Sequence, residues 1–194
     1  SGFRETFGGL HKKYGVNPDM AIFGKALGNG YAITALIGRR EIMEAAQSTF
    51  ISSTFWTERI GSVAALKTLE IMERDKSWET ITNTGNNISK SWLNLGNKYK
   101  LDVSVSGLPA LTGFNIHSDD WLKYKTLITQ EMLKKGILAT DSVYVCIEHK
   151  YRIVEDYFEK LEPIFEQIER CENGFPIDQL LDGSVCHVGF KRLN

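Results

Sequence analysis

A single lysine stands in the apolar, glycine-rich stretch PDMAIFGKALGNGYAITALIG, which runs from Pro18 to Gly38. An ammonium group costs free energy to remove from water unless it is paired, so Lys25 is either a surface residue at a strand end or a chemical group. A lysine that is shielded from water loses its proton more readily, and its neutral amine can then attack a carbonyl to form an imine. Lys25 is therefore the first candidate catalytic residue in this sequence.

The glycines around this lysine indicate a tight turn that a ligand can approach closely. Gly24, Gly28 and Gly30 carry no side chain that would keep backbone and ligand apart. The run GKALGNG matches neither the dinucleotide fingerprint G-x-G-x-x-G nor the phosphate loop G-x-x-x-x-G-K-[ST], because its lysine comes too early and no serine or threonine follows it. A nucleotide-binding loop is therefore not predicted here.

A second group of polar residues lies in the segment FISSTFWTERIG, just before a predicted helix. It contains Ser52, Ser53, Thr54 and Thr57. Hydroxyl groups and free backbone N–H groups at the start of a helix can hold a phosphate. The alternative is that Thr57 is only the N-cap of the helix, while Ser53 or Thr54 satisfies amides in the turn. The residues by themselves leave both interpretations open.

Histidines and cysteines show no pattern of a metal site or of a disulfide framework. No histidine has a second histidine or a carboxylate at the spacing of helical metal ligands, and the cysteines form no C-x-x-C pair. These residues are His11, His117, His149 and His187, and Cys146, Cys171 and Cys186. We expect no bound metal, and we expect the thiols to be reduced. His149 ends an apolar run, which is compatible with a place in a pocket or with a satisfied surface group.

The composition favours a soluble globular protein. The 194 residues are 42% hydrophobic and 24% charged, and their net charge is −1, so the chain can form a sizeable core. A nearly neutral chain lacks the net positive charge that would attract nucleic acid or an anionic membrane. Its apolar runs are much shorter than the roughly 20 residues that cross a bilayer, and no charged-then-apolar signal segment opens the chain. We expect a cytoplasmic protein whose partners include neither nucleic acid nor membrane.

Hydrophobic periodicity predicts helices that alternate with strands, and therefore an α/β protein. Apolar residues recur at helical spacing over Gly61–Arg74, Trp78–Tyr99, Asp120–Lys135 and Ile153–Arg170. The first of these helices should be largely buried, since it is apolar nearly all round at its start, and Pro163 should kink or restart the last one. Short strands are predicted at Met20–Phe23, Ala32–Gly38, Asp102–Gly107, Leu111–His117 and Ser142–His149.

The charged segment ERDKSW, from Glu73 to Trp78, marks the expected domain boundary. A buried helix precedes it and an amphipathic helix follows it, and the pattern after it is more self-contained. We therefore expect residues 1–75 to be the end of a larger domain. Residues 76–194 are expected to form a small α+β domain, with a tail from Asn173 onward that the pattern does not assign.

Several motifs in fixed order carry a resemblance to a known family. Five short motifs precede the segment STFWTERIGSVAALKTLEIM: Gly2-Phe3-Arg4, Pro18-Asp19, Gly24-Lys25, Gly28-Asn29-Gly30 and Gly38-Arg39-Arg40. This succession resembles the second half of class III aminotransferases, and most closely glutamate-1-semialdehyde 2,1-aminomutase and its relatives. The match is dense over about the first 75 residues, and looser features continue to the end of the chain.

The resemblance implies an enzyme of fold type I that uses pyridoxal 5′-phosphate. Lys25 matches the lysine that forms the internal aldimine with the cofactor and then moves the substrate proton. Thr54 matches the threonine that donates a hydrogen bond to the cofactor phosphate, usually from the neighbouring subunit of a homodimer. Gly28, Asn29 and Gly30 match the close backbone turn beside the active site. The implied substrates are a small-molecule amino donor and an amino aldehyde or keto compound.

The sequence departs from this family in two places. Trp56-Thr57-Glu58-Arg59 stands where the aminomutase has S-G-N-P, so its substrate does not carry over and an amino-sugar or other specialised aminotransferase stays open. The family also has an Asp-Glu pair just before the segment that matches Ser1 to Arg4, and that aspartate pairs with the pyridine nitrogen. We therefore expect a C-terminal fragment, with residues 1–75 as the last part of the large cofactor-binding domain and 76–194 as the small domain.

Such a fragment is expected to have weak activity or none without the missing N-terminal half. Aminotransferase and aminomutase share the same chemistry at the lysine, and they differ in whether the aminated intermediate is released or kept. The sequence leaves that choice open. A non-catalytic assembly or regulatory domain that keeps the aminotransferase shape is the alternative from another functional class.

Overall fold

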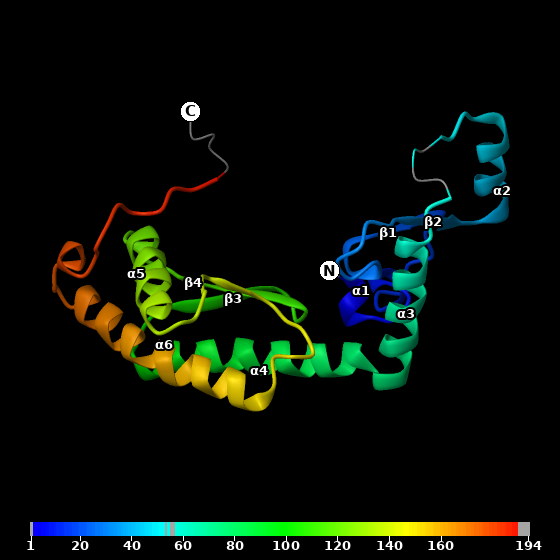
Figure 1. Ribbon diagram of the computed structural model, residues 1–194. Helices are drawn as coiled ribbons and strands as arrows, with labels where there is room; N and C mark the ends of the chain where they lie inside the picture. Colours follow the sequence, from blue (N-terminus) through cyan, green and yellow to red (C-terminus); the bar gives the residue numbers. More distant parts are fainter. Residues whose placement is uncertain (1, 53, 55–56, 190–194) are drawn as a thin grey trace. The chain divides into compact units, whose positions relative to one another are not determined.

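Amphipathic and apolar runs along the chain form the helices and strands that their periodicities require. The computed structural model describes residues 2–52, 54 and 57–189. In chain order its elements are α1 (Gly2–Glu5), η1 (Leu10–Lys12), β1 (Met20–Phe23), η2 (Lys25–Leu27), β2 (Ala35–Gly38), α2 (Arg40–Met43), η3 (Glu44–Ser48), α3 (Ile60–Asp75), α4 (Ser77–Lys98), β3 (Val103–Leu108), β4 (Leu111–Ile116), α5 (Trp121–Lys134), β5 (Ser142–Tyr144), α6 (Tyr151–Glu172) and η4 (Ile177–Gln179) (Figure 1).

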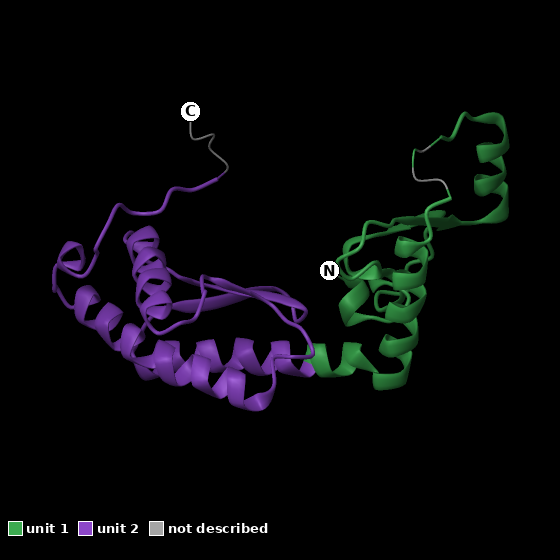
Figure 2. Ribbon diagram, in the orientation of Figure 1, with its two compact units in different colours: residues 1–82 green, residues 83–194 purple. Residues whose placement is uncertain are grey.

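The chain divides into two compact units, residues 1–82 and residues 83–194 (Figure 2). The division falls inside α4, whose first turns belong to the first unit. The expected boundary after residue 75 lies at the loop between α3 and α4, where Lys76 adopts a left-handed conformation with φ 46°. The assignment of the two parts to a large and a small domain stays a prediction.

The first unit is built on the antiparallel pair β1–β2, in which Met20 lies opposite Gly38 and Phe23 lies opposite Ala35. Helix α3 begins against the segment that leads into β2, since a Cβ at Gly61 would lie 2.6 Å from the carbonyl oxygen of Ala32. The strand predicted over Ala32–Gly38 is shorter in the structure, because only Ala35–Gly38, which is β2, pairs with β1.

Much of the apolar surface of this unit is open. Helix α3 was expected to be largely buried, but that expectation is wrong for this chain: Val63 is 63% exposed and Leu66 is 68% exposed. The strands show the same feature, with Ile22 at 77% exposure and with Leu36 and Ile37 at 48% and 56%. These segments have the apolar pattern of buried helices and strands. The described residues of the first unit do not bury them.

The second unit is a three-stranded antiparallel sheet, ordered β3-β4-β5, with helices packed against it. Phe114 on β4 contacts Trp92 on α4, Trp121 on α5 and Phe165 on α6, with ring centroids 4.7 to 5.9 Å apart. Because one strand residue points to one face of its sheet, these three helices share the same face. Trp92 and Phe165 are fully buried there, and they anchor the core of the unit.

Two predictions for the second unit need correction. The strand predicted over Ser142–His149 ends at Tyr144, since the amide of His149 donates to the carbonyl of Cys146 and closes a turn. Of the two outcomes predicted for Pro163, the restart is wrong: helix α6 runs without interruption from Tyr151 to Glu172, and Pro163 lies on its exposed face. A kink at Pro163 stays a prediction. A proline on the solvent side can leave the freed carbonyl to water, which lets the helix continue.

The other helix predictions are confirmed to within a residue or two at each end. Helix α5 stops where the sequence indicated, because Gly136 adopts φ 77° directly after it. None of the helices in the described ranges combines the length and the hydropathy that a membrane span needs.

Candidate functional site

Lys25 lies at the junction between β1 and the short helix η2. Gly24 keeps extended backbone with φ −156°, and Lys25 then turns into the left-handed region with φ 49°. The carbonyl of Lys25 accepts hydrogen bonds from the amides of Gly28 and Asn29, both at 3.2 Å. A positive φ is uncommon for a residue with a Cβ, and such strain gathers at turns and functional sites. The backbone thus fixes how the lysine leaves the strand.

The turn after Lys25 requires the small residues that the sequence provides. A Cβ at Gly28 would lie 2.0 Å from the carbonyl oxygen of Tyr31, so only glycine fits there. Asn29 and Gly30 both have positive φ, 46° and 108°, which asparagine and glycine adopt more readily than other residues. These three residues form a close turn, and their contact with a ligand stays a prediction.

A cavity of about 520 Å³ lies beside Lys25 within the first unit. Backbone of Gly9 and Gly24 forms part of its wall, and the rings of Phe3 and Phe23 in its lining pack edge to face at 5.8 Å. A volume of this size accommodates a small organic molecule. Sequence reasoning did not identify the two phenylalanines, because each reads as an ordinary apolar residue until the fold brings β1 against α1.

The amine of Lys25 is available to bind a cofactor. Lys25 is exposed, and no residue in the described part of the chain hydrogen-bonds or ion-pairs with this amine. The cavity and the free amine therefore fit the covalent anchor of a cofactor with an aldehyde group. The shielding from water that a catalytic lysine needs is not supplied by residues 2–52, 54 and 57–82 themselves.

Helix α1, which contributes Phe3 to the cavity, also carries a buried carboxylate. Glu5 is only 5% exposed, and its Oε1 atom pairs with the amine of Lys13. The hydrogen bond that Lys13 donates to this carboxylate raises the pKa of Lys13 above its ordinary value. The second oxygen, Oε2, has no partner among the described residues. Glu5 is therefore held by Lys13, and sequence reasoning missed it because a glutamate on a short helix normally faces water.

Thr54 lies in an exposed turn that precedes α3. The start of α3 is capped by Glu58, whose carboxylate accepts from the amides of Ile60 and Gly61, the latter at 3.2 Å. The alternative reading of Thr57 as the N-cap is therefore wrong. Because Glu58 already occupies these amides, a phosphate here would depend on hydroxyl groups more than on the helix terminus. The predictions for Ser53 and for Trp56 fall outside the described residues.

Two of the remaining candidates, His117 and His149, are hydrogen-bonded within the second unit. His149 accepts a hydrogen bond at Nδ1 from the amide of Cys146 at 3.3 Å, and Nε2 of His117 lies 2.8 Å from Oγ of Ser104. Within the described ranges, no three histidine, cysteine or acidic side chains come together as metal ligands would. Cys146, Cys171 and Cys186 are free thiols.

Comparison with known proteins gives one matching family model, described as "Aminotransferase class-III", over residues 5–171. A 3-aminobutyryl-CoA aminotransferase from Cloacimonas acidaminovorans is 35% identical over 155 residues, which cover 77% of this chain and 37% of that protein. A glutamate-1-semialdehyde 2,1-aminomutase from Methanocaldococcus jannaschii is 25% identical over 186 residues, or 87% of this chain and 43% of that protein. The chain thus spans about two fifths of the length of these relatives.

Solved structures share the fold. The FumI protein of Sphingopyxis sp. MTA144, in its internal aldimine form with pyridoxal phosphate, superposes with a TM-score of 0.75 at 22% identity. The superposition covers 88% of this chain and 42% of that one. The described α/β architecture is therefore part of a larger known fold, and both of its units contribute to the match.

Proposed function

This chain belongs to the class III aminotransferase family, whose cofactor is pyridoxal 5′-phosphate, and we propose that it forms the C-terminal portion of an aminotransferase or aminomutase in which Lys25 holds the cofactor. The observation that carries the proposal is the position of Lys25. It is an unpaired amine in a left-handed turn at a strand end, beside a cavity walled by glycine backbone. Residue types and geometry both suit covalent binding of an aldehyde.

Each proposed role follows from what this chain places near the cavity. Bound pyridoxal phosphate supplies the electron sink that stabilises a carbanion on the substrate. Nζ of Lys25 anchors the cofactor at rest, and it takes and returns the substrate proton during turnover. Phe3 and Phe23 line the cavity and keep part of it apolar. The turn at Gly28, Asn29 and Gly30 lets a ligand come close to the backbone.

The open surfaces of the first unit support the proposal that residues 1–75 are the last part of a larger cofactor-binding domain. Leu36 and Ile37 are neighbours on β2, so they point to opposite faces, and both are about half exposed. A strand that is apolar on both faces is typical of a sheet with layers on each side. A two-stranded sheet is also marginal by itself. Residues 76–194 then correspond to the small domain.

We propose that the reaction transfers an amino group between a small-molecule donor and an aldehyde or keto compound. Lys25 and its turn serve aminotransferase and aminomutase chemistry equally, because both reactions need the same proton transfer at Nζ. A panel of amino donors distinguishes them: a transferase releases a keto product from the donor, whereas a mutase returns an isomer of its single substrate.

The proposed anchor predicts one site of covalent labelling. The gene product that contains this chain is incubated with pyridoxal phosphate, reduced with borohydride and mapped by peptide mass spectrometry. We expect one phosphopyridoxyl group per chain, on Lys25, because its amine is free beside the cavity. Reduction onto a different lysine would refute the role of Lys25. Labelling of no lysine above background would favour the non-catalytic assembly or regulatory domain instead.

We further propose a homodimer in which Thr54 donates to the cofactor phosphate of the partner subunit. Thr54→Val keeps the shape of the side chain and removes the hydroxyl. A hydrogen bond to a charged group contributes about 1.5–3 kcal/mol, so the dissociation constant for pyridoxal phosphate should rise by about 10- to 100-fold. Titration of the cofactor absorbance measures this change. Thr57→Val, which alters another exposed hydroxyl of the same loop, should leave the constant unchanged.

A mixing experiment tests whether the contact crosses between subunits. One subunit carries Lys25→Ala and the other carries Thr54→Val. If Thr54 serves the partner's site, a mixed dimer contains one intact site, and activity at low cofactor concentration should return. Activity that stays at the level of the two parents would show that lysine and threonine act within one subunit.

A further inference from the structure

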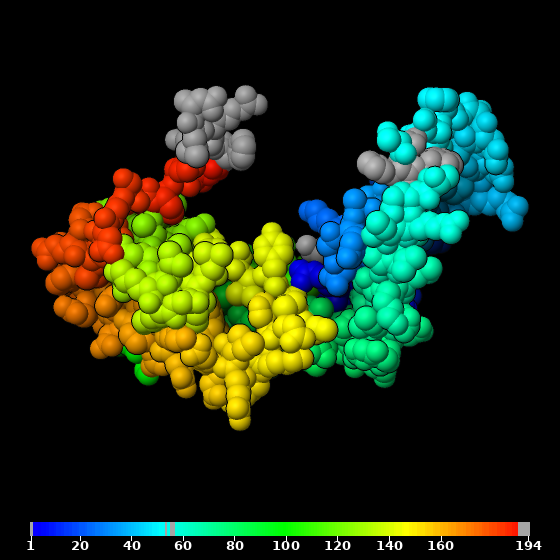
Figure 3. All heavy atoms as spheres, in the orientation of Figure 1, coloured from blue at the N-terminus to red at the C-terminus, as the bar shows by residue number. Residues whose placement is uncertain are grey.

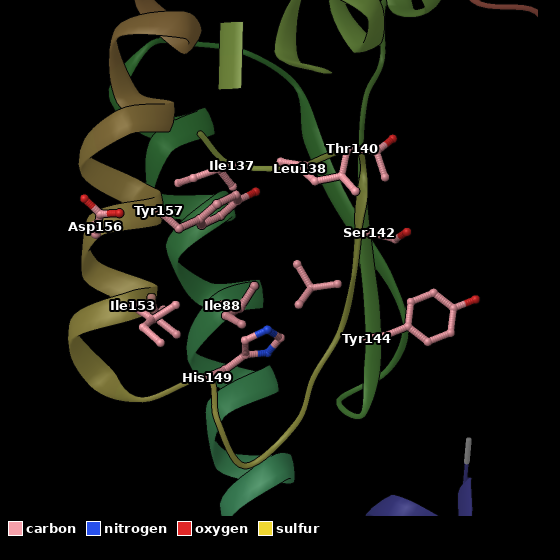
Figure 4. A pocket seen from close by; sticks show the side chains of 13 residues that line it. Ile88, Ile137, Leu138, Thr140, Ser142, Tyr144, His149, Ile153, Asp156 and Tyr157 are labelled. Atoms are coloured by element: carbon pink, nitrogen blue, oxygen red, sulfur yellow. The ribbon is translucent and has the colours of Figure 1, made fainter. Parts of the chain in front are cut away.

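A cavity of about 510 Å³ opens in the second unit between α4, α6 and the segment that leads into β5 (Figure 4). Its lining is mainly apolar and includes Ile88, Ile137, Leu138 and Ile153. The segment around residues 137–150 lies on the surface of the unit (Figure 3, yellow), and Leu138 is 89% exposed, so the cavity is accessible from solvent. Small-molecule sites typically have volumes of about 300–1,000 Å³.

Tyr157 adds a hydroxyl group to this mainly apolar lining, which also contains Thr140, Ser142 and His149. It follows Ile153 by one turn of α6, and both side chains point toward the cavity (Figure 4). The hydroxyl oxygen of Tyr157 accepts a hydrogen bond from Nε1 of Trp92 at 3.1 Å. Burial raises the pKa of this phenol well above its ordinary value, so the proton stays on the oxygen.

The proton of this hydroxyl has no acceptor in the described part of the chain. An indole nitrogen only donates, so Trp92 uses the oxygen of Tyr157 and leaves its proton unpaired, and no other side chain or carbonyl in the described ranges accepts it. Tyr157 is half-buried and the cavity opens to solvent, so this donor bonds water in the free protein, and a ligand with an acceptor can take the place of that water. A ligand that enters this cavity therefore gains a hydrogen bond in addition to apolar contact.

Charges around the cavity limit the kind of acceptor. The lining formed by the described residues contains no lysine or arginine, and its histidine, His149, already uses Nδ1 to accept a hydrogen bond from the amide of Cys146. Asp156 is directed away from the cavity and pairs with Lys160 at 2.7 Å (Figure 4). An ionised carboxylate or phosphate would enter an apolar site without a counter-charge, which is unfavourable. A neutral carbonyl oxygen avoids that cost.

We propose that this cavity binds a small, uncharged, mainly apolar molecule whose carbonyl oxygen accepts a hydrogen bond from Tyr157. The site lies entirely within residues 83–194, so it is independent of the role of Lys25. This site therefore does not depend on the cofactor or on the amino-group transfer proposed above.

Two probes of similar shape test this site, acetophenone with a carbonyl and ethylbenzene without one. Each is titrated into the isotopically labelled gene product that contains this chain, and amide shifts are followed by NMR. Both should perturb residues 137–144 and 151–157, and acetophenone should bind about 10-fold more tightly, as expected for one added hydrogen bond. Equal affinities, or shifts that map elsewhere, would overturn the proposal.

Three variants separate the hydrogen bond from apolar contact. Tyr157→Phe should make the two affinities equal and leave that of ethylbenzene unchanged. Tyr151→Phe is the matched control on the same helix, since its hydroxyl bonds Glu155 outside the cavity, and it should preserve the preference. Ile153→Trp should weaken both probes about 10-fold by filling the cavity. A preference for acetophenone that survives Tyr157→Phe refutes the assignment. If Tyr157→Phe fails to fold, the wild-type preference and its loss of affinity in Ile153→Trp decide.

Discussion

Lys25→Ala should lower amino-group transfer by the gene product that contains this chain by about 10³-fold or more. General acid–base catalysis by one positioned side chain contributes about 10²–10⁴-fold, and this variant also removes the anchor for the cofactor. Steady-state turnover with saturating pyridoxal phosphate measures the loss. The borohydride label should disappear in the same variant, which connects the kinetic effect to the covalent site.

Two companion variants exclude simpler explanations for such a loss. Lys25→Arg keeps the positive charge but has no nucleophilic amine, so it should be as inactive as Lys25→Ala. Lys100 is a matched control, because it is an exposed lysine in the same left-handed conformation, with φ 53° against 49° for Lys25. Lys100→Ala should retain normal turnover. Added methylamine should restore a small part of the activity of Lys25→Ala, since it can replace the missing proton carrier.

Retained turnover in Lys25→Ala would contradict the proposed mechanism. A loss of similar size in Lys100→Ala would contradict it as well, because the common feature would then be backbone strain at an exposed lysine. The combination of an inactive Lys25→Arg and an active Lys100→Ala is expected only if the amine of Lys25 does the chemistry.

The sequence predicted the position of Lys25 well because local signals determine it. A strand of branched and aromatic residues ends at Phe23, and glycine and asparagine permit the turn that follows. The two long helices α4 and α6 were predicted for a similar reason, since each has a continuous apolar stripe. Their periodicity does not depend on which element they pack against.

Features that depend on distant segments were not predictable in the same way. The hydrogen bond that Tyr157 accepts comes from Trp92, which lies 65 residues away along the chain. The prediction that α3 is buried was wrong because an apolar pattern indicates a surface suited to burial. The pattern does not indicate which segment packs against that surface. Val63 and Leu66 remain exposed for that reason.

Gly85→Ala should lower the free energy of unfolding of the second unit by about 2–3 kcal/mol, as an overpacked core position does. Gly85 lies on α4 where that helix contacts the β3–β4 turn. A Cβ there would lie 1.9 Å from the carbonyl oxygen of Pro109 and 2.5 Å from its carbonyl carbon. These are backbone atoms, so no side-chain rotation relieves the contact, and either the helix or the turn must move.

The sign of this effect is informative because local propensity predicts the opposite. Alanine in a helix interior is favoured over glycine by about 1 kcal/mol, so a loosely packed α4 would become more stable on substitution. The turn has little freedom to yield, since the carbonyl of Ala110 accepts a hydrogen bond from the amide of Val145 at 3.1 Å. Moving Pro109 would therefore disturb the connection between the β3–β4 turn and the segment after β5.

Urea unfolding of the 194-residue chain, followed by far-UV circular dichroism, measures the change, with two glycine controls. Gly96 is also on α4, where a Cβ would lie 2.6 Å from Cγ2 and 2.7 Å from Cβ of Val103 and 3.1 Å from the carbonyl oxygen of Leu101. Its nearest backbone contact is longer than the 1.9 Å contact at Gly85, so Gly96→Ala should cost less than Gly85→Ala. Gly183→Ala should be nearly neutral, because no atom lies within 4 Å of the added Cβ. Equal or greater stability of Gly85→Ala would mean that α4 does not seat against the turn at Pro109, and the packing of α4 in this unit would then need revision.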